Sequence, residues 1–151
     1  MRNFLFLVFF ITSFNISSEE TISRWMSDYF KRIHGHIADE NYDKALDELE
    51  LGVTNYFRNG RTYEAALCYQ LYGQYYAVQS QYTEAVPWFE KALATDKMPR
   101  IGMQEVRFQL AQTYFMIGNY KNVIALLEEF IRVGERLSLI HISEPTRPIA
   151  I

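Results

Sequence analysis

Apolar side chains recur every three or four residues along most of the chain, which is the spacing of helices that bury one face. The clearest case runs through residues 62–79, where tyrosine, leucine and alanine hold the repeating positions. Ser80 and Gln81 follow as a polar turn, and a second apolar series then extends to about Thr95. Thr62 is expected to cap the first helix, because its hydroxyl can accept a hydrogen bond from a free backbone N–H. The pattern therefore predicts two helices joined by a short turn.

The same pattern returns farther along the chain. The interval from Gly73 to Ala111 equals the interval from Tyr82 to Tyr120. Two pairs of positions with one shared offset indicate an internal repeat, in which each helical pair buries its apolar face against a neighbour.

A less regular helical pair precedes these two. Asn41 and Tyr42 form its expected turn, and Asp43 is placed to cap the helix that follows. A loop is expected at 96–102, before the last pair. The expected helices cover about 19–39, 43–58, 62–79, 82–95, 103–117 and 121–134. The chain is therefore predicted to be all-α, with about three helical hairpins.

The first residues have the character of a secretory signal. Arg2 is followed by an apolar run, Phe4–Ile11, which is far shorter than the ~20 residues that span a bilayer. We expect cleavage after Ser18 or, as a close alternative, after Ser17; the other interpretation is an uncleaved anchor. Residues 1–18 are therefore interpreted as a signal peptide, and the mature chain as periplasmic or secreted without stable membrane insertion.

The last residues break the helical pattern. Residues 137–147 resemble the translation of a transposon-based sequencing adapter, and Pro145 and Pro148 stand close together. Residues 137–151 are therefore interpreted as a non-native or disordered tail, the alternative being a natural flexible end. On this interpretation the helical domain covers 19–136 and is a fragment of a longer protein.

The two regular hairpins resemble tetratricopeptide (TPR) repeats. In the second hairpin the family's signature positions hold Tyr69, Tyr72, Gly73, Tyr76, Tyr82, Ala85, Phe89 and Ala92. In the third hairpin they hold Leu110, Ala111, Tyr114, Gly118, Tyr120, Leu127 and Phe130. The first hairpin departs from the pattern, since Ile33 stands where a small residue is expected. The resemblance implies a TPR-like α-solenoid of about three hairpins that serves as a non-enzymatic scaffold for protein–protein interactions.

A narrower resemblance concerns Phe89–Leu93, the Met98–Pro99 linker and Leu110–Tyr114, which are similar to exported repeat proteins that accompany TonB–ExbB–ExbD systems. It implies a partner in an envelope complex of this type. Two other functions stay open on the sequence. One is the N-terminal extracytoplasmic sensor region of a membrane signalling protein, such as a histidine kinase or transcription regulator, and the other is a helical accessory region of an enzyme.

The composition contains few residues that suggest catalysis. The net charge of −3 and the scattered basic residues argue against a nucleic-acid partner. The single cysteine, Cys68, excludes an intramolecular disulfide and is expected to be a buried thiol. His34 and His36 are two residues apart, so on a helix they diverge and cannot share a metal. We therefore predict no catalytic, cofactor-binding or metal-binding residue.

Recognition of a protein or peptide is the chemistry that remains. The resemblance implies that the first helix of each hairpin lines a concave groove. The expected groove side chains are Phe30, His34, Gln70, Gln74, Phe108, Gln109, Gln112 and Phe115. The glutamines would hydrogen-bond the backbone of a peptide, and the phenylalanines would hold an apolar side chain. The alternative is that another helix of a longer solenoid covers this surface.

The final helix carries apolar side chains on more than one side, at Val123, Leu126, Leu127, Phe130 and Ile131. A solenoid normally ends in a helix whose outer face is polar. We therefore expect exposed apolar surface at the C-terminal end of the repeats, and self-association through it.

Overall fold

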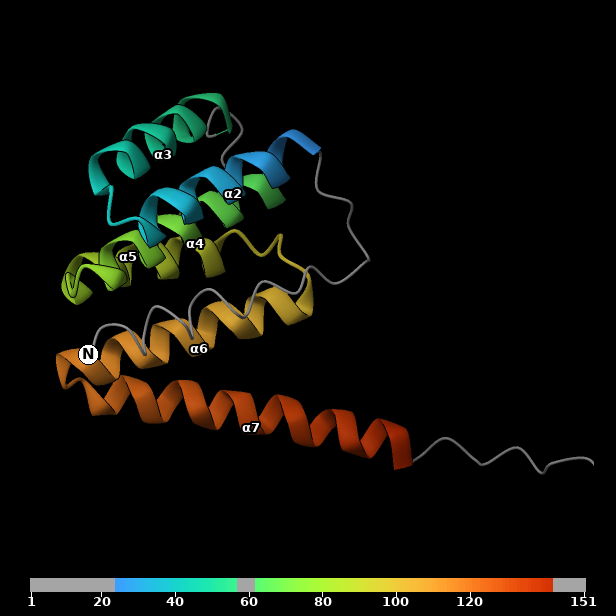
Figure 1. Cartoon of the computed structure of the whole chain (residues 1–151). Helices are drawn as coiled ribbons and strands as arrows, with labels where there is room; N and C mark the ends of the chain where they lie inside the picture. Colours follow the sequence, from blue (N-terminus) through green and yellow to red (C-terminus); the bar gives the residue numbers. More distant parts are fainter. Residues whose placement is uncertain (1–23, 57–61, 143–151) are drawn as a thin grey trace, which may run out of the picture.

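The computed structural model describes residues 24–56 and 62–142, and over these ranges the chain forms α-helices and no strand (Figure 1). The helices are α2 (Arg24–Ala38), α3 (Tyr42–Tyr56), α4 (Tyr63–Val78), α5 (Tyr82–Ala94), α6 (Arg100–Ile117) and α7 (Tyr120–Ile142). The all-α prediction is confirmed. The signal peptide expected at 1–18 and residues 143–151 of the expected tail lie outside the described residues.

The helices pack in chain order, each against the one that precedes it and the one that follows, with the most extensive contact between α4 and α5. Figure 1 shows α3 at one end of the molecule and α7 at the other. The largest fully buried side chains are Tyr29, Phe89, Met26, Ile33, Leu49, Leu71, Val106, Thr113 and Cys68. These residues belong to α2 through α6, so the core lies between those helices and α7 packs on its edge.

The turns inside the three hairpins share one backbone feature. Glu40, Ser80 and Gly118 have positive φ angles of 56°, 63° and 84°, and each is followed two residues later by the next helix. A left-handed residue at this position lets the chain leave a helix while the last carbonyls keep hydrogen-bond partners. Glycine adopts this conformation without the steric cost that the other two residues bear. The hairpins are therefore related in backbone conformation as well as in sequence.

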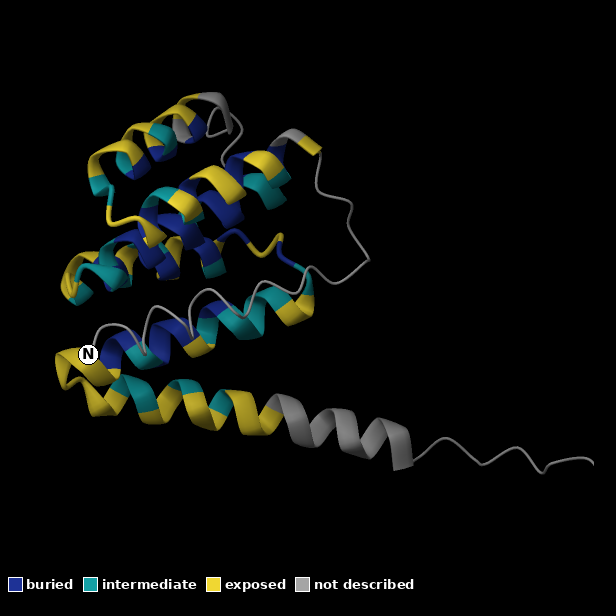
Figure 2. Cartoon of the chain, viewed as in Figure 1, coloured by how far each residue is buried: buried dark blue, intermediate teal, exposed yellow. Residues whose placement is uncertain are grey.

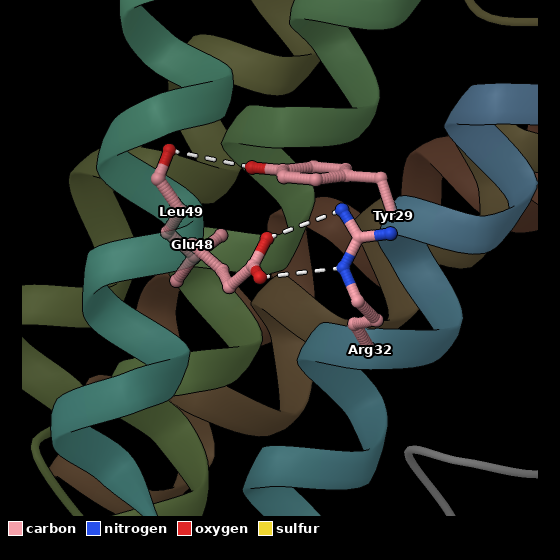
Figure 3. Close-up of polar contacts among 4 residues, drawn as sticks. All are labelled: Tyr29, Arg32, Glu48 and Leu49. Atoms are coloured by element: carbon pink, nitrogen blue, oxygen red, sulfur yellow. Dashed lines mark hydrogen bonds and ion pairs between the residues drawn. The ribbon is translucent and has the colours of Figure 1, made fainter.

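Polar contacts between α2 and α3 add to the apolar packing of the first hairpin (Figure 3). The Tyr29 hydroxyl donates to the backbone carbonyl of Leu49 at 3.3 Å. The Arg32 guanidinium donates from Nε and Nη2 to the two carboxylate oxygens of Glu48, each at 3.3 Å. The buried hydrogen bond contributes about 1 kcal/mol, and the exposed ion pair less. Specific polar contacts thus supplement the apolar core in the hairpin that has the weakest sequence pattern.

The two helices of the second hairpin make the most extensive contact of any pair of described helices. Thr62 caps α4 as expected, since its hydroxyl oxygen accepts from a backbone N–H of the first turn at 3.2 Å. A Cβ atom at Gly73 would lie 2.6 Å from the ring of Phe89, so the absence of a side chain permits this approach of α4 to α5. The rings of Tyr72 and Trp88 stack with centroids 4.3 Å apart. A small residue among aromatic rings therefore sets the spacing of this hairpin.

Two helix starts differ from the prediction. Helix α6 begins at Arg100, directly after Pro99, so the loop expected at 96–102 is shorter. Pro99 is the N-cap, where its missing N–H and fixed φ of −54° cost nothing, so the helix begins at the next residue. Helix α3 begins at Tyr42, so Asp43 lies in its first turn rather than in front of it. There the carboxylate still favours the helix through the dipole.

Helix α7 also extends beyond its expected end. It continues to Ile142, so the loss of helical structure expected from residue 137 is wrong for 137–142. Extending an existing helix costs much less than starting one, so α7 continues past Gly134, and the first proline after α7 begins is Pro145. The likeness of 137–147 to an adapter translation concerns the origin of these residues and stays a prediction.

Candidate protein-binding surface

The expected groove residues fall into three environments. The buried members, each 3% exposed or less, are Phe30, Gln70, Gln74 and Gln109. The half-buried members are His34 and Gln112. The exposed members are Phe108, at 45%, and Phe115, at 58%. Half of the expected groove therefore lies inside the helical stack in this structure, and its two exposed members both belong to α6.

Two of the three buried glutamines, Gln70 and Gln109, connect one helix to another. Gln70 Nε2 in α4 donates to Gln109 Oε1 in α6 at 3.1 Å, and Gln109 Nε2 donates to Glu105 Oε1 at 3.4 Å. Burial raises the pKa of Glu105 to about 7, although a hydrogen bond from Gln70 acts in the opposite direction. These amides, expected to meet a peptide backbone, instead join α4 to α6.

Helix α6 is also attached to α5. The Tyr114 hydroxyl donates to Glu90 Oε1 at 2.6 Å, and burial followed by the contact with Glu90 raises the pKa of Tyr114 to about 12. One hydrogen bond to each helix therefore places α6 across both members of the second hairpin.

The surface of α6 and α7 is rich in exposed apolar side chains. Over the described residues, the exposed large apolar side chains of these two helices are Ile101, Phe108, Phe115, Met116, Ile117, Tyr120, Ile124, Leu127, Phe130 and Ile131. Among the described residues, Leu51 in α3 is the one exposed large apolar side chain that lies outside α6 and α7. Figure 2 shows the same contrast, with the residues of α4 largely buried and those of the described part of α7 exposed or half-buried. The apolar surface expected at this end is confirmed.

Two adjoining hollows lie between α6 and α7. One has a volume of about 180 Å³ and is lined by Arg107, Phe108, Ala111, Leu126, Leu127 and Phe130. The other has a volume of about 280 Å³ and is lined by Phe108, Ala111, Gln112, Phe115, Met116, Val123 and Leu127. We call this surface the α6–α7 seam and define it by Phe108, Ala111, Phe115, Leu127 and Phe130. An ion pair at 3.0 Å between Arg107 and Glu129 joins the two helices beside it.

The internal repeat relates the seam to buried positions of the second hairpin. Leu127 is 46% exposed, whereas Phe89, its counterpart one repeat earlier, is 0% exposed. Phe115 is 58% exposed, and its counterpart Ala77 is 2% exposed. Helix α6 packs next to the second hairpin, and no helix of the described residues follows α7. The seam thus occupies positions whose counterparts are buried one hairpin earlier, in a hairpin that another helix follows.

Groups with catalytic potential are enclosed or scattered. Burial raises the pKa of the Cys68 thiol to about 12, so it is not a reactive thiolate. Burial also lowers the pKa of His34, which favours its neutral form. The described residues contain no cluster of three side chains able to hold a metal ion. Among the same residues, no helix combines the length and apolar character needed to cross a membrane.

Comparison of the chain with protein families, with curated proteins and with solved structures gives no match. The geometry of the chain itself therefore defines the candidate site. Sequence reasoning named Phe108 and Phe115 within a groove of first helices, but it did not join them to Leu127 and Phe130 of the last helix. The available signal was the apolar character of that helix on more than one side.

Proposed function

We propose that this chain is an exported, non-enzymatic scaffold with a TPR-like α-solenoid fold, and that it binds another protein through the α6–α7 seam. The constant offset between repeated positions and the recurring hairpin turn support the solenoid. The basic and apolar N-terminal residues support export. A TonB-type envelope complex is the narrower candidate for the partner, on the resemblance of the linker and of α6.

The observation that carries this proposal is the exposed apolar seam. Large exposed apolar surfaces are uncommon on monomeric proteins and mark sites of interaction. The seam is lined almost wholly by aliphatic and aromatic side chains. Sites for small molecules generally add a few convergent polar groups to such a lining. The lining of the seam therefore favours the apolar side chains of a protein over a polar substrate.

Photo-crosslinking in the organism that carries the gene tests the proposal. The full chain is made with p-benzoylphenylalanine in place of Phe115, in the seam, and separately in place of Leu51. Leu51 is a matched control, because it is 60% exposed and lies on α3. We expect a discrete adduct with another protein, identified by mass spectrometry, at position 115 and not at position 51.

Equal adducts at the two positions would contradict the proposal, since they would report general stickiness of exposed apolar side chains. Absence of an adduct at position 115 would contradict it as well. An adduct at 115 that disappears when Phe130 is also replaced by serine would strengthen it, because Phe130 lies on the opposite wall of the seam.

A further inference from the structure

We infer that the occupant of the α6–α7 seam is a single amphipathic α-helix from a partner polypeptide, seated as α6 is seated on α4 and α5. This inference rests on the proposed function and specifies the partner's chemistry. Its basis is a comparison within the molecule, because equivalent positions of the internal repeat are buried in the second hairpin and exposed in the third.

The covered state shows which kind of element fits. Helix α6 lies next to the second hairpin, with Gln109 bonded to α4 and Tyr114 bonded to α5. Its buried side chains are Val106, Gln109, Leu110, Ala111, Thr113 and Tyr114. They recur three or four residues apart, as on one face of a helix. One helix with such a stripe is therefore sufficient to enclose a hairpin of this repeat.

The first hairpin shows the same relationship. Helix α4 follows it, and the rings of Tyr42 in α3 and Tyr75 in α4 meet edge to face with centroids 6.3 Å apart. In the first hairpin, the same interval before Gln70, Ala77 and Phe89 gives their counterparts, Phe30, Ile37 and Leu49. Each of these three counterparts is 3% exposed or less. Two hairpins of this chain are thus followed and covered by a helix, which makes a helix the expected occupant of the third.

The seam also indicates what the helix carries. Phe108 and Phe115 are two helical turns apart, about 10 Å along α6, with Ala111 between them. A large aliphatic side chain on the occupant fits over Ala111, between the two rings. Glu128, the counterpart of Glu90 in the next repeat, is exposed on α7. A hydroxyl or amine on the occupant can donate to it, as Tyr114 donates to Glu90.

A second copy of this chain fits the seam less well. Two identical seams facing each other would place hollow against hollow and leave unfilled volume, whereas a convex helix fills a concave surface. The opposite end of the molecule presents charge, through exposed residues that include Arg24, Asp28 and Lys31 of α2 and Asp43, Lys44 and Asp47 of α3. Burying those charges against apolar side chains would be unfavourable. The surface of the chain thus favours a partner with an apolar helical stripe.

The test uses a fluorescent peptide with the sequence of α6, Arg100–Ile117, as the probe and the full chain as the receptor. The peptide carries the stripe that covers the second hairpin, and fluorescence anisotropy measures its binding. A control peptide with aspartate in place of Val106 and Leu110 has the same length but a broken stripe. We expect saturable binding of the first peptide, and binding at least about tenfold weaker for the second.

Two receptor variants locate the binding site. Leu127→Ser lies in the seam, and Leu51→Ser makes the same change on α3, where the leucine is also exposed. We expect Leu127→Ser to weaken peptide binding about tenfold or more and Leu51→Ser to leave it unchanged, with circular dichroism showing that both variants fold. Phe115→Ser provides a second variant in the seam, with the same expected loss.

Three results would overturn the inference. Absence of saturable peptide binding is one, and binding insensitive to Leu127→Ser and Phe115→Ser is another. The third is a dimer in sedimentation that either variant dissociates, because a second copy would then be the occupant. If position 115 still gives an adduct with another protein in cells, the proposed function stands while the helical occupant fails. If neither experiment finds a partner, both fail.

Discussion

The second and third hairpins occupy equivalent positions of the internal repeat, yet one is enclosed and the other is open. Phe89 in α5 is 0% exposed, whereas its counterpart Leu127 in α7 is 46% exposed. The side chains are similarly apolar, so hydrophobicity does not explain the difference. The packing differs, because the Phe89 ring lies against Gly73 in α4 and α6 follows this hairpin, whereas no described helix follows α7. Burial at these positions thus depends on how the surrounding helices pack.

The two hairpins also differ in the size of their equivalent side chains. Ala77 and Ala92 are buried, while their counterparts Phe115 and Phe130 are exposed. Small side chains leave room for a neighbouring helix to approach closely, whereas aromatic rings take up that room. A helix bound in the α6–α7 seam is therefore expected to lie farther from α6 and α7 than α6 lies from the second hairpin, unless it presents small side chains to the two rings. This difference gives the seam a preference among helices.

Truncating the equivalent side chains Phe89 and Leu127 tests the comparison of the two hairpins most directly. Phe89→Ala empties a fully enclosed position, so we expect the free energy of unfolding to fall by about 3–5 kcal/mol. Leu127→Ala removes a half-exposed side chain and is expected to cost about 1 kcal/mol or less. Urea unfolding of the full chain, followed by circular dichroism, gives both values. Similar losses at the two positions would mean that a neighbour in solution already encloses the seam.

A second comparison concerns glycines in the closed and open parts of the stack. At Gly73 an added Cβ would lie 2.6 Å from the buried ring of Phe89, so Gly73→Ala is expected to cost about 1–3 kcal/mol. At Gly35 an added Cβ meets nothing within 4 Å. Gly35→Ala is therefore expected to stabilise α2 by about 0.5–1 kcal/mol through helix propensity. Thermal and urea unfolding measure both effects, and a stabilising Gly73→Ala would contradict the close packing of α4 and α5.

The elements of the fold were accessible from the sequence because local patterns determine them. The apolar spacing predicted the α-helices, and the Thr62 cap and the glycine at position 73 act as their residue types suggest. The earlier start of α6 depends on Pro99, which was assigned to a loop although proline also begins helices. The extension of α7 through 137–142 depends on propagation from a helix already formed. The sequence of 137–142 alone does not show that a helix already precedes it.

The binding surface was only partly accessible, because a glutamine has no intrinsic preference for surface or interior. Gln70 and Gln109 were expected to face a partner, yet they hydrogen-bond each other across α4 and α6. Their pairing depends on two helices that meet far apart in the sequence. The exposure of Leu127 and Phe130 was foreseeable, since α7 has more apolar positions than one neighbour can cover.

The smallest effect expected in the closed part is a pH dependence from Glu105. Burial raises its pKa from 4.5 to about 7, so between these values the folded chain holds a proton that the unfolded chain has released. Its contribution to stability is therefore fully present below about pH 4.5 and is lost as the pH rises through about 7.

Glu105→Gln removes this dependence, and at pH 8 we expect the variant to be more stable than the parent chain by about 1 kcal/mol, allowing for partial exposure. Urea unfolding at pH 5 and pH 8 measures the difference, with Glu84→Gln on the exposed side of α5 as the matched control. An equal pH response of the parent and Glu105→Gln would show that the carboxyl group is well solvated, and that the junction of α4 with α6 is as open as the seam.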